Sequence, residues 1–509
     1  MKLPKLPVKP LPRALPLRKL IGPSFILLGL GLGSGEVILW PFLASNYGMG
    51  IIWGAMVGIT LQFFMNMEIE RYALARGESV FVGLKRKLSG MPWWFLFSTF
   101  VPWIWPGIAA ASATLFVNVF GWSDDSQKWT AMVMLVLMGA ILSLGPILYK
   151  TVERFQMILI SVGVPAIFIL SIYLAGNANI GEVAQGLVGV GTDSGGADFW
   201  LLPSGIAIAS FLAALAYAGA GGNLNLAQSF YVKEKGLGMG KYSGRITSVL
   251  TGKVEKKSIL TGQKFNVNPN SVKNFNKWWR NINIEHFLVF WLTGSITIIL
   301  LSLMAYNTTF GQASTSDISF VIQEATEIGK AITPWVGTFF LTVAGFTLFG
   351  TQLTVYDATS RIISENVVLA SGQRIKDKHV PTVYYSTLWL MIASGIVIFL
   401  SGFTQPLQLL ILAAVLNAFA MFVHSGLTLW LNKTSLPKEI APNVFRTSVM
   451  MFAFLFYGGF SAYVIYDRIR QYQDNFADWG GYQVWGYSAV ALIVLGMIFA
   501  FYKILGRRK

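Results

Sequence analysis

Two glycine-rich segments place polar groups inside apolar stretches of the sequence, and these groups are the candidates for chemistry. The first segment reads GLGLGSGE and supplies Gly33, Ser34, Gly35 and Glu36. A carboxyl group within an apolar stretch is costly unless it is protonated or paired, so Glu36 is a candidate to bind a cation or to carry a proton. The glycines weaken a helix enough to leave backbone carbonyl groups free as further ligands.

The second segment reads AYAGAGGNLNLAQ and follows the same pattern. It supplies Ala220, Gly221, Gly222, Asn223, Asn225 and Gln228. Its amide side chains offer oxygen ligands and N–H donors beside a run of glycines, where an ion or a solute can bind. Gln352 and Asn417, in two later apolar stretches, are amides that could reach the same site. The alternative role for these amides is hydrogen bonding between helices.

Several kinds of catalysis lack the residues that they need. The sequence has no cysteine, which removes thiol catalysis and thiolate metal ligands. The three histidines, His286, His379 and His424, do not have the spacing of a zinc site. Neither a Walker-A phosphate loop nor a nucleophile–base pair is apparent. The sequence therefore predicts neither an enzyme nor a bound cofactor.

The apolar stretches that hold the candidate residues are long enough to cross a membrane. Hydrophobic residues make up 54% of the 509 residues and charged residues only 12%. About twenty apolar residues cross a hydrocarbon layer of roughly 30 Å as a helix, and strand-like alternation is absent. We predict an all-α polytopic membrane protein with twelve helices, at residues 20–44, 51–70, 92–121, 129–148, 155–175, 200–231, 286–307, 332–360, 380–402, 405–431, 447–466 and 484–503.

The positions of the basic residues predict the orientation of these helices. The formal net charge is +16, which in a soluble protein could indicate binding to nucleic acid. With the N-terminus in the cytoplasm, however, all but four of the 39 Lys and Arg residues fall on the cytoplasmic side; the four are Lys128, Lys330, Arg468 and Arg470. This bias fits the positive-inside rule. We predict an inner-membrane protein with both termini in the cytoplasm, the lipid bilayer as its surroundings and no nucleic-acid partner.

The two glycine-rich breaks fall in the first and the sixth predicted helices, five helices apart. This spacing is expected when helices 1–5 and 6–10 are inverted repeats that each open with a discontinuous helix. The predicted organisation is a basic, Pro-rich arm at 1–19, a first repeat at 20–175, an outer loop at 176–199, a second repeat at 200–431 and helices 11–12 at 447–509. We expect the arm to be a disordered tail against lipid head groups, and the cytoplasmic insertion at 233–285 to be a solvated loop.

Three sequence motifs, in matching order and spacing, resemble the Nramp family of divalent-metal transporters. They are the Gly-Pro-Ser-Phe start of the first helix, KTVERFQMILISVGVP and GTQLTVYDATSRIISE. The resemblance covers helices 1 to 11 and implies the leucine-transporter type of fold. The family's Asp-Pro-Gly-Asn in the first break aligns with Gly33–Glu36, and its Met-Pro-His-Asn in the second break aligns with Ala220–Asn223. The resemblance thus implies Glu36 and Asn223 as metal ligands, without the soft Met sulfur that helps to favour transition metals.

Three functions remain open from the sequence. In the first, Glu36, amides and carbonyls carry a divalent cation such as Mg²⁺ or Mn²⁺. In the second, the Gly-Ser-Gly segment receives the carboxylate of a small organic solute such as an amino acid, as in other transporters of this broad fold. In the third, the protein does not transport and serves as a membrane sensor or scaffold. For a transporter we expect alternating access, with helices 1, 2, 6 and 7 rocking against the rest and Glu36 coupling proton movement.

Overall fold

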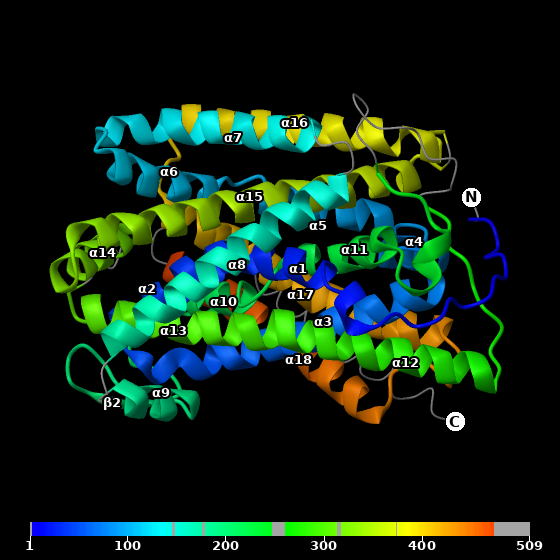
Figure 1. Ribbon diagram of the computed structural model, residues 1–509, viewed down its shortest axis with the longest axis horizontal. Helices are drawn as coiled ribbons and strands as arrows, with labels where there is room; N and C mark the ends of the chain where they lie inside the picture. Colours follow the sequence, from blue (N-terminus) through cyan, green and yellow to red (C-terminus); the bar gives the residue numbers. More distant parts are fainter. Residues whose placement is uncertain are drawn as a thin grey trace.

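The computed structural model describes residues 3–144, 148–175, 179–246, 260–312, 317–372 and 374–472. Within these residues, ten helices are long and apolar enough to cross a membrane. They lie side by side, with most of them close to the long axis of the molecule (Figure 1). The chain is therefore an all-α polytopic membrane protein, as predicted. The predicted twelfth helix at 484–503 lies outside the described residues, so the count of twelve and the inverted repeat stay predictions.

The ten helices are built from α-helical segments with short π- and 3-10-helical joints. In chain order these segments are α1 (Pro23–Gly31), η2 (Leu32–Leu39), α2 (Trp40–Tyr47), η3 (Met49–Ile51), α3 (Ile52–Arg76), α5 (Met91–Trp103), α6 (Gly107–Phe120), η4 (Asp124–Ser126), α7 (Gln127–Leu144), α8 (Leu148–Ala175), α12 (Pro269–His286), η7 (Phe287–Leu292), α13 (Thr293–Thr309), α15 (Pro334–Ala370), η8 (Asp377–His379), α16 (Val380–Leu400), α17 (Pro406–Ser435) and α18 (Val444–Tyr472).

Helices α15 and α17 form the centre of the bundle. α15 packs against α5, α6, α8, α16 and the π-helical η2, and α17 packs against α5, α6 and α18. Both central helices also contact the broken sixth segment, which consists of α10 (Ile208–Ala216), the 3-10 helix η5 (Gly222–Ala227) and α11 (Gln228–Lys235). This segment is the predicted discontinuous helix, and its parts are each too short to span a membrane alone.

The first helix differs from the prediction in one respect. It is helical throughout from Pro23 to Tyr47, and a π-helix, η2, stands where a gap was expected. The glycine-rich stretch is therefore a wider helix and not an interruption. A side chain from α15 accounts for this change, as described with the site below.

The expectation of a solvated loop at 233–285 is wrong for most of its described part. Residues up to Lys235 complete α11, η6 (Gly238–Tyr242) follows, and α12 begins at Pro269 and runs without interruption into α13. Asn268 caps α12 through a reciprocal capping box with Ser271, and Pro269 stands at the first helical turn, where its missing N–H costs nothing.

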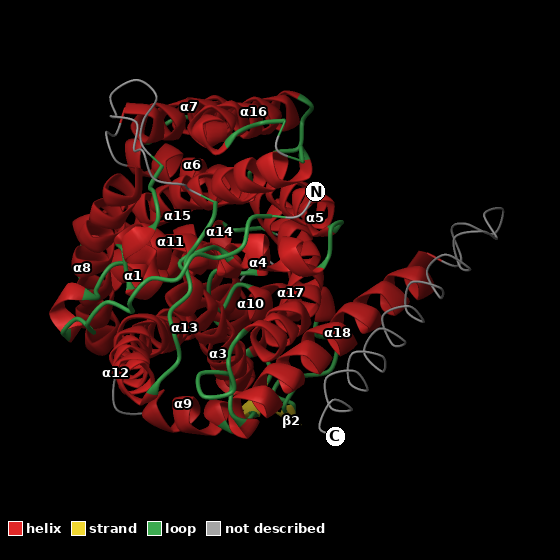
Figure 2. Ribbon diagram, turned by 90° about the vertical axis from the view of Figure 1, so that its right-hand side faces the viewer, coloured by secondary structure: helices red, strands yellow, loops and turns green. Residues whose placement is uncertain are grey.

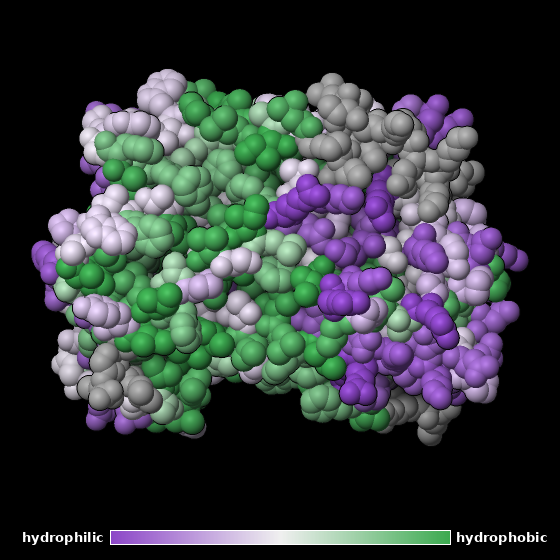
Figure 3. All heavy atoms as spheres, in the orientation of Figure 1, coloured by the Kyte–Doolittle hydropathy of each residue, from purple (hydrophilic) through white to green (hydrophobic). Residues whose placement is uncertain are grey.

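The two ends of the bundle carry different elements. One end has the N-terminal arm with η1 (Leu17–Lys19), α4 (Val80–Lys87), α11 and α12, and Figure 2 looks onto it. The other end has α9 (Asn179–Leu187), α14 (Ser319–Ala331) and an antiparallel pair of strands, β1 (Val190–Thr192) and β2 (Asp198–Trp200), with Gly191 opposite Phe199. Hydrophilic residues cover the end that carries the arm, and apolar residues cover much of the remaining visible face (Figure 3). We call the first end the basic end.

Candidate functional site

The break between α10 and α11 is made by glycines with positive φ. The helix α10 stops at Ala216, and Gly221 and Gly222 have φ values of +73° and +56°. Other L-residues rarely adopt this left-handed region, so the two adjacent glycines turn the chain at little cost. A Cβ atom on Gly222 would lie 1.9 Å from Oδ1 of Asn417. Glycine is thus also required here because α17 lies directly against the backbone of the break.

One side chain of α3 satisfies the backbone groups that the break leaves without helical partners. Gln62 donates through Nε2 to the carbonyls of Leu215 and Ala216, at 3.3 and 3.0 Å. Its Oε1 accepts from the N–H of Gly221 at 3.3 Å. Because buried backbone groups need partners, Gln62 stabilises the discontinuous conformation. Its function at the site is structural.

Two side chains of α17 reach the same turn. His424 donates from Nε2 to the carbonyl of Gly222 at 2.9 Å, since a carbonyl can only accept. Asn417 donates from Nδ2 to the hydroxyl of Tyr217 at 3.1 Å. The remaining polar atoms, Nδ1 of His424 and Oδ1 of Asn417, are buried and have no hydrogen-bond partner among the described residues. Asn417, predicted as a site residue, therefore does reach the break.

Asn223 lies between the break and α5. Its Nδ2 donates to the hydroxyls of Ser98 and Thr99, at 2.8 and 2.9 Å. These bonds fix the amide, and its Oδ1 is left buried without a partner in the described part of the chain. Trp103, further along α5, stacks on Tyr217 with ring centroids 5.5 Å apart. The break is thus bordered by amide oxygens on two sides and by an aromatic pair.

The π-helix of the first helix results from an inserted hydroxyl group. Oγ1 of Thr351, on α15, donates to the carbonyl of Gly29 at 2.7 Å and accepts from the N–H of Gly33 at 3.0 Å. In an α-helix these two backbone groups would bond to each other. A side chain inserted in this way opens the helical ladder, which accounts for the wider turns of η2.

Two glycines of the first helix face the break in the sixth segment. A Cβ atom on Gly31 would lie 2.6 Å from the carbonyl oxygen of Gly219, and one on Gly35 would lie 1.7 Å from that of Tyr217. The two backbones therefore touch, and any larger residue would push the first helix away from the break. Gly31 and Gly35 thus allow the contact with the break, whereas Gly33 faces α15, where a Cβ atom would lie 2.6 Å from Oγ1 of Thr351.

Glu36 points to a different neighbour. It is fully buried, and neither carboxylate oxygen has a hydrogen-bond partner among the described residues. One of these oxygens lies 3.4 Å from the Cβ position of Gly294 on α13, beside Ile59 and Leu28. The structure does not bring Glu36 into hydrogen-bond contact with Asn223, the other predicted metal ligand. The carboxyl group instead lies in an apolar environment between the first helix, α3 and α13.

The other predicted residues are buried in the bundle, but the contacts place only some of them. Ser34, Asn225 and Gln352 each have a buried polar atom without a partner among the described residues, and Ala220 is fully buried. Gln228, the first residue of α11, bonds to α3, because its Nε2 donates to Glu70 at 3.2 Å. Within the described residues, no group of three or more His, Asp or Glu side chains could hold a metal ion. The polar atoms that the structure shows at the break are those of the amides of Asn223 and Asn417, the imidazole of His424 and the hydroxyl of Tyr217.

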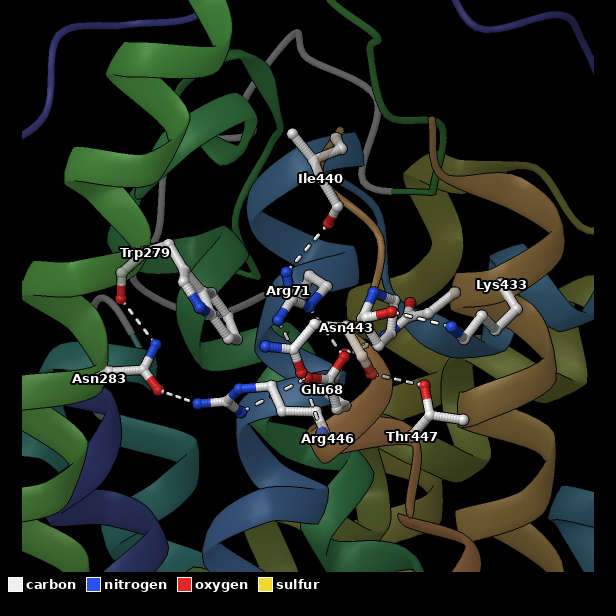
Figure 4. A network of polar contacts seen from close by, with 11 residues as sticks. Glu68, Arg71, Trp279, Asn283, Lys433, Ile440, Asn443, Arg446 and Thr447 are labelled. Carbon is white, nitrogen blue, oxygen red and sulfur yellow. Dashed lines mark hydrogen bonds and ion pairs between the residues drawn. The ribbon is translucent and has the colours of Figure 1, made fainter. Parts of the chain in front are cut away.

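A network of charged residues joins helices toward the basic end (Figure 4). Glu68 forms a two-pronged ion pair with Arg71, at 2.8 and 3.1 Å, and also accepts from Arg446 of α18 at 3.4 Å. Arg71 donates to the carbonyl of Ile440 and lies 3.8 Å from the ring of Trp279 on α12. Glu70, two residues after Glu68, has a different partner: it accepts from Nε2 of Gln228 at 3.2 Å.

Sequence reasoning missed the contributions of α5 and of Tyr217. Ser98 and Thr99 orient Asn223, and Trp103 stacks on Tyr217. A signal was present, since two adjacent hydroxyl residues lie in an aromatic span shortly before Pro102. Their proximity to the break, however, depends on packing between segments more than one hundred residues apart.

Comparisons with known proteins identify the fold. No family model matches the sequence, and no curated protein matches it. Among solved structures, a variant of the manganese transporter of Eremococcus coleocola is similar over 99% of both chains, with 12% identity and a TM-score of 0.70. A nucleobase-cation-symport-1 family transporter, Mhp1, in a closed conformation with bromovinylhydantoin bound, is similar over 99% of this chain and 96% of its own, with 12% identity and a TM-score of 0.54. The chain therefore has the fold of these membrane transporters, the leucine-transporter type that the resemblance implied.

Proposed function

We propose that the protein is a secondary-active transporter that moves a divalent cation across the cell membrane by alternating access. The observation that carries this proposal is a pair of buried amide oxygens, Oδ1 of Asn223 and Oδ1 of Asn417, which have no hydrogen-bond partner among the described residues and lie at a helix break in a transporter fold. Buried polar atoms without partners are rare in proteins and call for a functional reason. A transported cation supplies the missing partner.

The ligand set favours a hard cation. The amide oxygen atoms of Asn223 and Asn417 suit Mg²⁺ or Mn²⁺, which bind with part of their water shell retained. The break itself, AYAGAGGNLNLAQ, contains no sulfur ligand. We therefore propose that selection for soft transition metals is weak. In this proposal the metal ion is the substrate and the protein holds no resident cofactor.

Glu36 acts as the coupling group in this mechanism. Its carboxyl group is buried in apolar surroundings, where a charge is costly unless it is paired. It follows Gly35, which touches the carbonyl of Tyr217 at the break. A proton or cation that changes the state of Glu36 therefore alters the packing of the first helix on α13 and, through Gly35, on the break.

The orientation follows from the charges. The arm and the loops near the basic end hold most of the Lys and Arg residues, so we propose that this end faces the cytoplasm. The N-terminal arm then lies in the cytoplasm, and we propose the same side for the C-terminus because of its basic residues. The ion pairs of Glu68 lie toward that side and join α3 to α18.

Uptake of Mn²⁺ and Mg²⁺ into proteoliposomes tests the proposal. We expect Asn223→Ala and Asn417→Ala each to lower uptake at least tenfold, because each removes an oxygen ligand and leaves its neighbours unpaired. Asn118→Ala is the matched control, since this exposed asparagine bonds only within α6. Glu36→Gln should abolish the pH dependence of uptake. Equal uptake by the wild type and both asparagine variants would contradict the assignment of Asn223 and Asn417 as ligands. Absence of any metal uptake would contradict a divalent cation as the substrate.

The second candidate is a small organic solute. It is favoured by the stacked pair of Trp103 and Tyr217, because aromatic faces beside a helix break suit a planar or apolar group. The indole N–H of Trp103 is also buried without a partner among the described residues. Isothermal titration with a panel of amino acids separates the two candidates. If neither metals nor solutes bind or shift the melting temperature, the non-transporting sensor or scaffold is the better reading.

A further inference from the structure

The proline-rich arm is ordered and bound, contrary to the expectation of a disordered tail. Its first prolines follow a three-residue period, at Pro4, Pro7 and Pro10, which is the repeat of a polyproline II helix. The carbonyl of Pro4 accepts from Arg86 at 2.6 Å, that of Pro7 from the N–H of Lys264 at 2.9 Å, and that of Pro10 from the hydroxyl of Tyr242 at 2.9 Å. One edge of the extended arm is thus hydrogen-bonded at every turn.

A row of side chains on α12 binds the second half of the arm. Asn274, Trp278 and Asn281 are spaced by four and three residues, so they share one face of the helix. Trp278 donates from its indole nitrogen to the carbonyl of Pro12 at 2.8 Å, and Asn281 donates to that of Leu15 at 2.9 Å.

Asn274 holds the arm from both sides. Its Nδ2 donates to the carbonyl of Pro12 at 2.8 Å, and its Oδ1 accepts from the N–H of Ala14 at 3.0 Å. One amide therefore satisfies a donor and an acceptor of the arm, which fixes the position of the arm along α12. Electrostatic attraction between the arm and α12 alone would not fix which residue of the arm lies beside Asn274.

The side chains of the arm separate by polarity. Leu3, Leu11 and Leu15 are half-buried and pack against the apolar core, while Lys5 and Lys9 are exposed. The arm also forms a short parallel bridge in which Val8 pairs with Lys264. A tail attracted only by lipid head groups would not bury one set of its side chains in the protein.

The surface that binds the arm is itself firmly held. The neighbouring residue of α12, Trp279, contacts Arg71 of α3 and Arg446 of α18, at 3.8 and 4.7 Å. The segment that bonds to Pro7 and Lys9 is anchored to the end of α3, because Gln263 donates its N–H to the carbonyl of Arg76 at 2.7 Å. The arm therefore lies against a preformed surface, which lowers the entropic cost of binding.

We propose that Asn274, Trp278, Asn281, Tyr242 and Arg86 form a binding site for a proline-rich, extended peptide, and that residues 3–15 of the chain occupy it as a strap across the basic end. Aromatic N–H and amide groups that bond the carbonyls of a polyproline II segment are a recurring mode of peptide recognition. The prolines reduce the freedom that the arm loses on binding. The proposal goes beyond transport and does not depend on it.

Cysteine labelling of the purified full-length protein tests the strap, since the chain has no native cysteine. Ala14→Cys places a small thiol at a half-buried position of the arm, and we measure its rate of reaction with a water-soluble maleimide. Adding Asn274→Ala and Asn281→Ala should raise this rate about tenfold, because several hydrogen bonds of modest strength are lost together. Adding Asn276→Ala, an exposed asparagine of the same helix, should leave the rate unchanged. Equal rates in all three proteins would overturn the proposal.

A crosslink tests the strap without altering its binding residues. Val8→Cys and Lys264→Cys place two thiols at bridge partners, where the geometry suits a disulfide. Mild oxidation should crosslink most of the protein. The pair Val8→Cys and Lys330→Cys is the control, because Lys330 lies on α14 at the other end of the bundle (Figure 1). Failure of the first pair to crosslink, or equal crosslinking of both pairs, would overturn the proposal.

Discussion

A single hydroxyl group sets the shape of the first helix. Thr351 joins the carbonyl of Gly29 to the N–H of Gly33, and both groups are buried. Thr351→Val keeps the size of the side chain but leaves these backbone groups without a partner. We expect the free energy of unfolding to fall by about 1–3 kcal/mol, the usual cost of an unsatisfied buried polar group. Thermal unfolding in detergent measures the change.

Thr342→Val is the control for this prediction. Thr342 lies on the same helix, α15, and its hydroxyl bonds only to the carbonyl of Thr338, one turn earlier. Its loss breaks no contact between helices, so the melting temperature should stay close to that of the wild type. A similar loss of stability in both variants would mean that the bridge to the first helix contributes nothing of its own.

The sequence predicted that the candidate residues are buried, but not which neighbours they face. Glu36, Asn223 and Asn417 are all buried, as expected for polar residues that serve a site within the membrane. Periodicity cannot say which neighbour a buried side chain faces when a helix is apolar on all sides. Glu36 thus faces Gly294, whereas Asn417 reaches Gly222. Thr351, which changes the helical geometry between them, comes from a segment far along the chain.

At the scale of elements, the buried ion pairs of Glu68 on α3 should contribute to stability. The side chains of Glu68 and Arg71 are 0% and 6% exposed, and Arg446 joins them from α18. Glu68→Gln leaves Arg71 without its charge partner in a buried site. We expect a loss of about 3 kcal/mol or more in the free energy of unfolding, as for other broken buried pairs.

An exposed ion pair gives the comparison. Glu327 and Lys330 of α14 lie 2.7 Å apart, with side chains 34% and 67% exposed. Solvent screens such pairs, so Glu327→Gln should cost less than about 1 kcal/mol. Chemical denaturation of both variants in the same detergent checks the difference. Equal losses would show that burial of the Glu68 pair adds no stability.

Helix α14 should give the protein a pH-dependent stability. Burial raises the pKa of the Glu324 carboxyl well above its ordinary value of 4.5. The folded protein then keeps this proton at pH values where the unfolded chain has lost it, so stability falls as the pH rises above about 4.5. Glu324→Gln removes this loss. Its melting temperature should match the wild type near pH 4 and exceed it increasingly toward pH 8, while Glu327→Gln on the same helix shows no such trend.

The sequence predicted the break in the sixth segment correctly, but it did not predict the helix α12. The positive φ values at Gly221 and Gly222 agree with the predicted break, because glycine adopts the left-handed region that other residues rarely enter. The basic, Gly- and Asn-rich composition of 233–285 favours the prediction of a loop. Asn268, Pro269 and Ser271, however, form a recognisable helix start. A polar composition indicates that a segment is exposed to solvent, whereas a capping pattern indicates where its backbone becomes helical. In this segment the capping pattern was the better guide.

At the scale of the whole molecule, the arm and the ion pairs gather at the basic end. The proposed strap connects α4 to α12, which continues into α13 beside Glu36. The charge pattern of the sequence predicted which residues lie at this end, but not that the arm binds there, because a proline-rich segment is compatible with both a free tail and a bound strap. If the protein is a transporter, the contacts of the arm with α4 and α12 have to break before the substrate site can open toward the basic end.

Locking the strap should therefore stop transport. In proteoliposomes, oxidation of the protein with Val8→Cys and Lys264→Cys should lower Mn²⁺ uptake at least tenfold, and a reducing agent should restore it, because a covalent bond between bridge partners keeps the basic end closed. The single substitution Val8→Cys controls for the oxidant. Unchanged uptake in a fully crosslinked protein would mean that the strap stays bound throughout the transport cycle. Its role would then be to stabilise α12, and alternating access would have to open the basic end beside it.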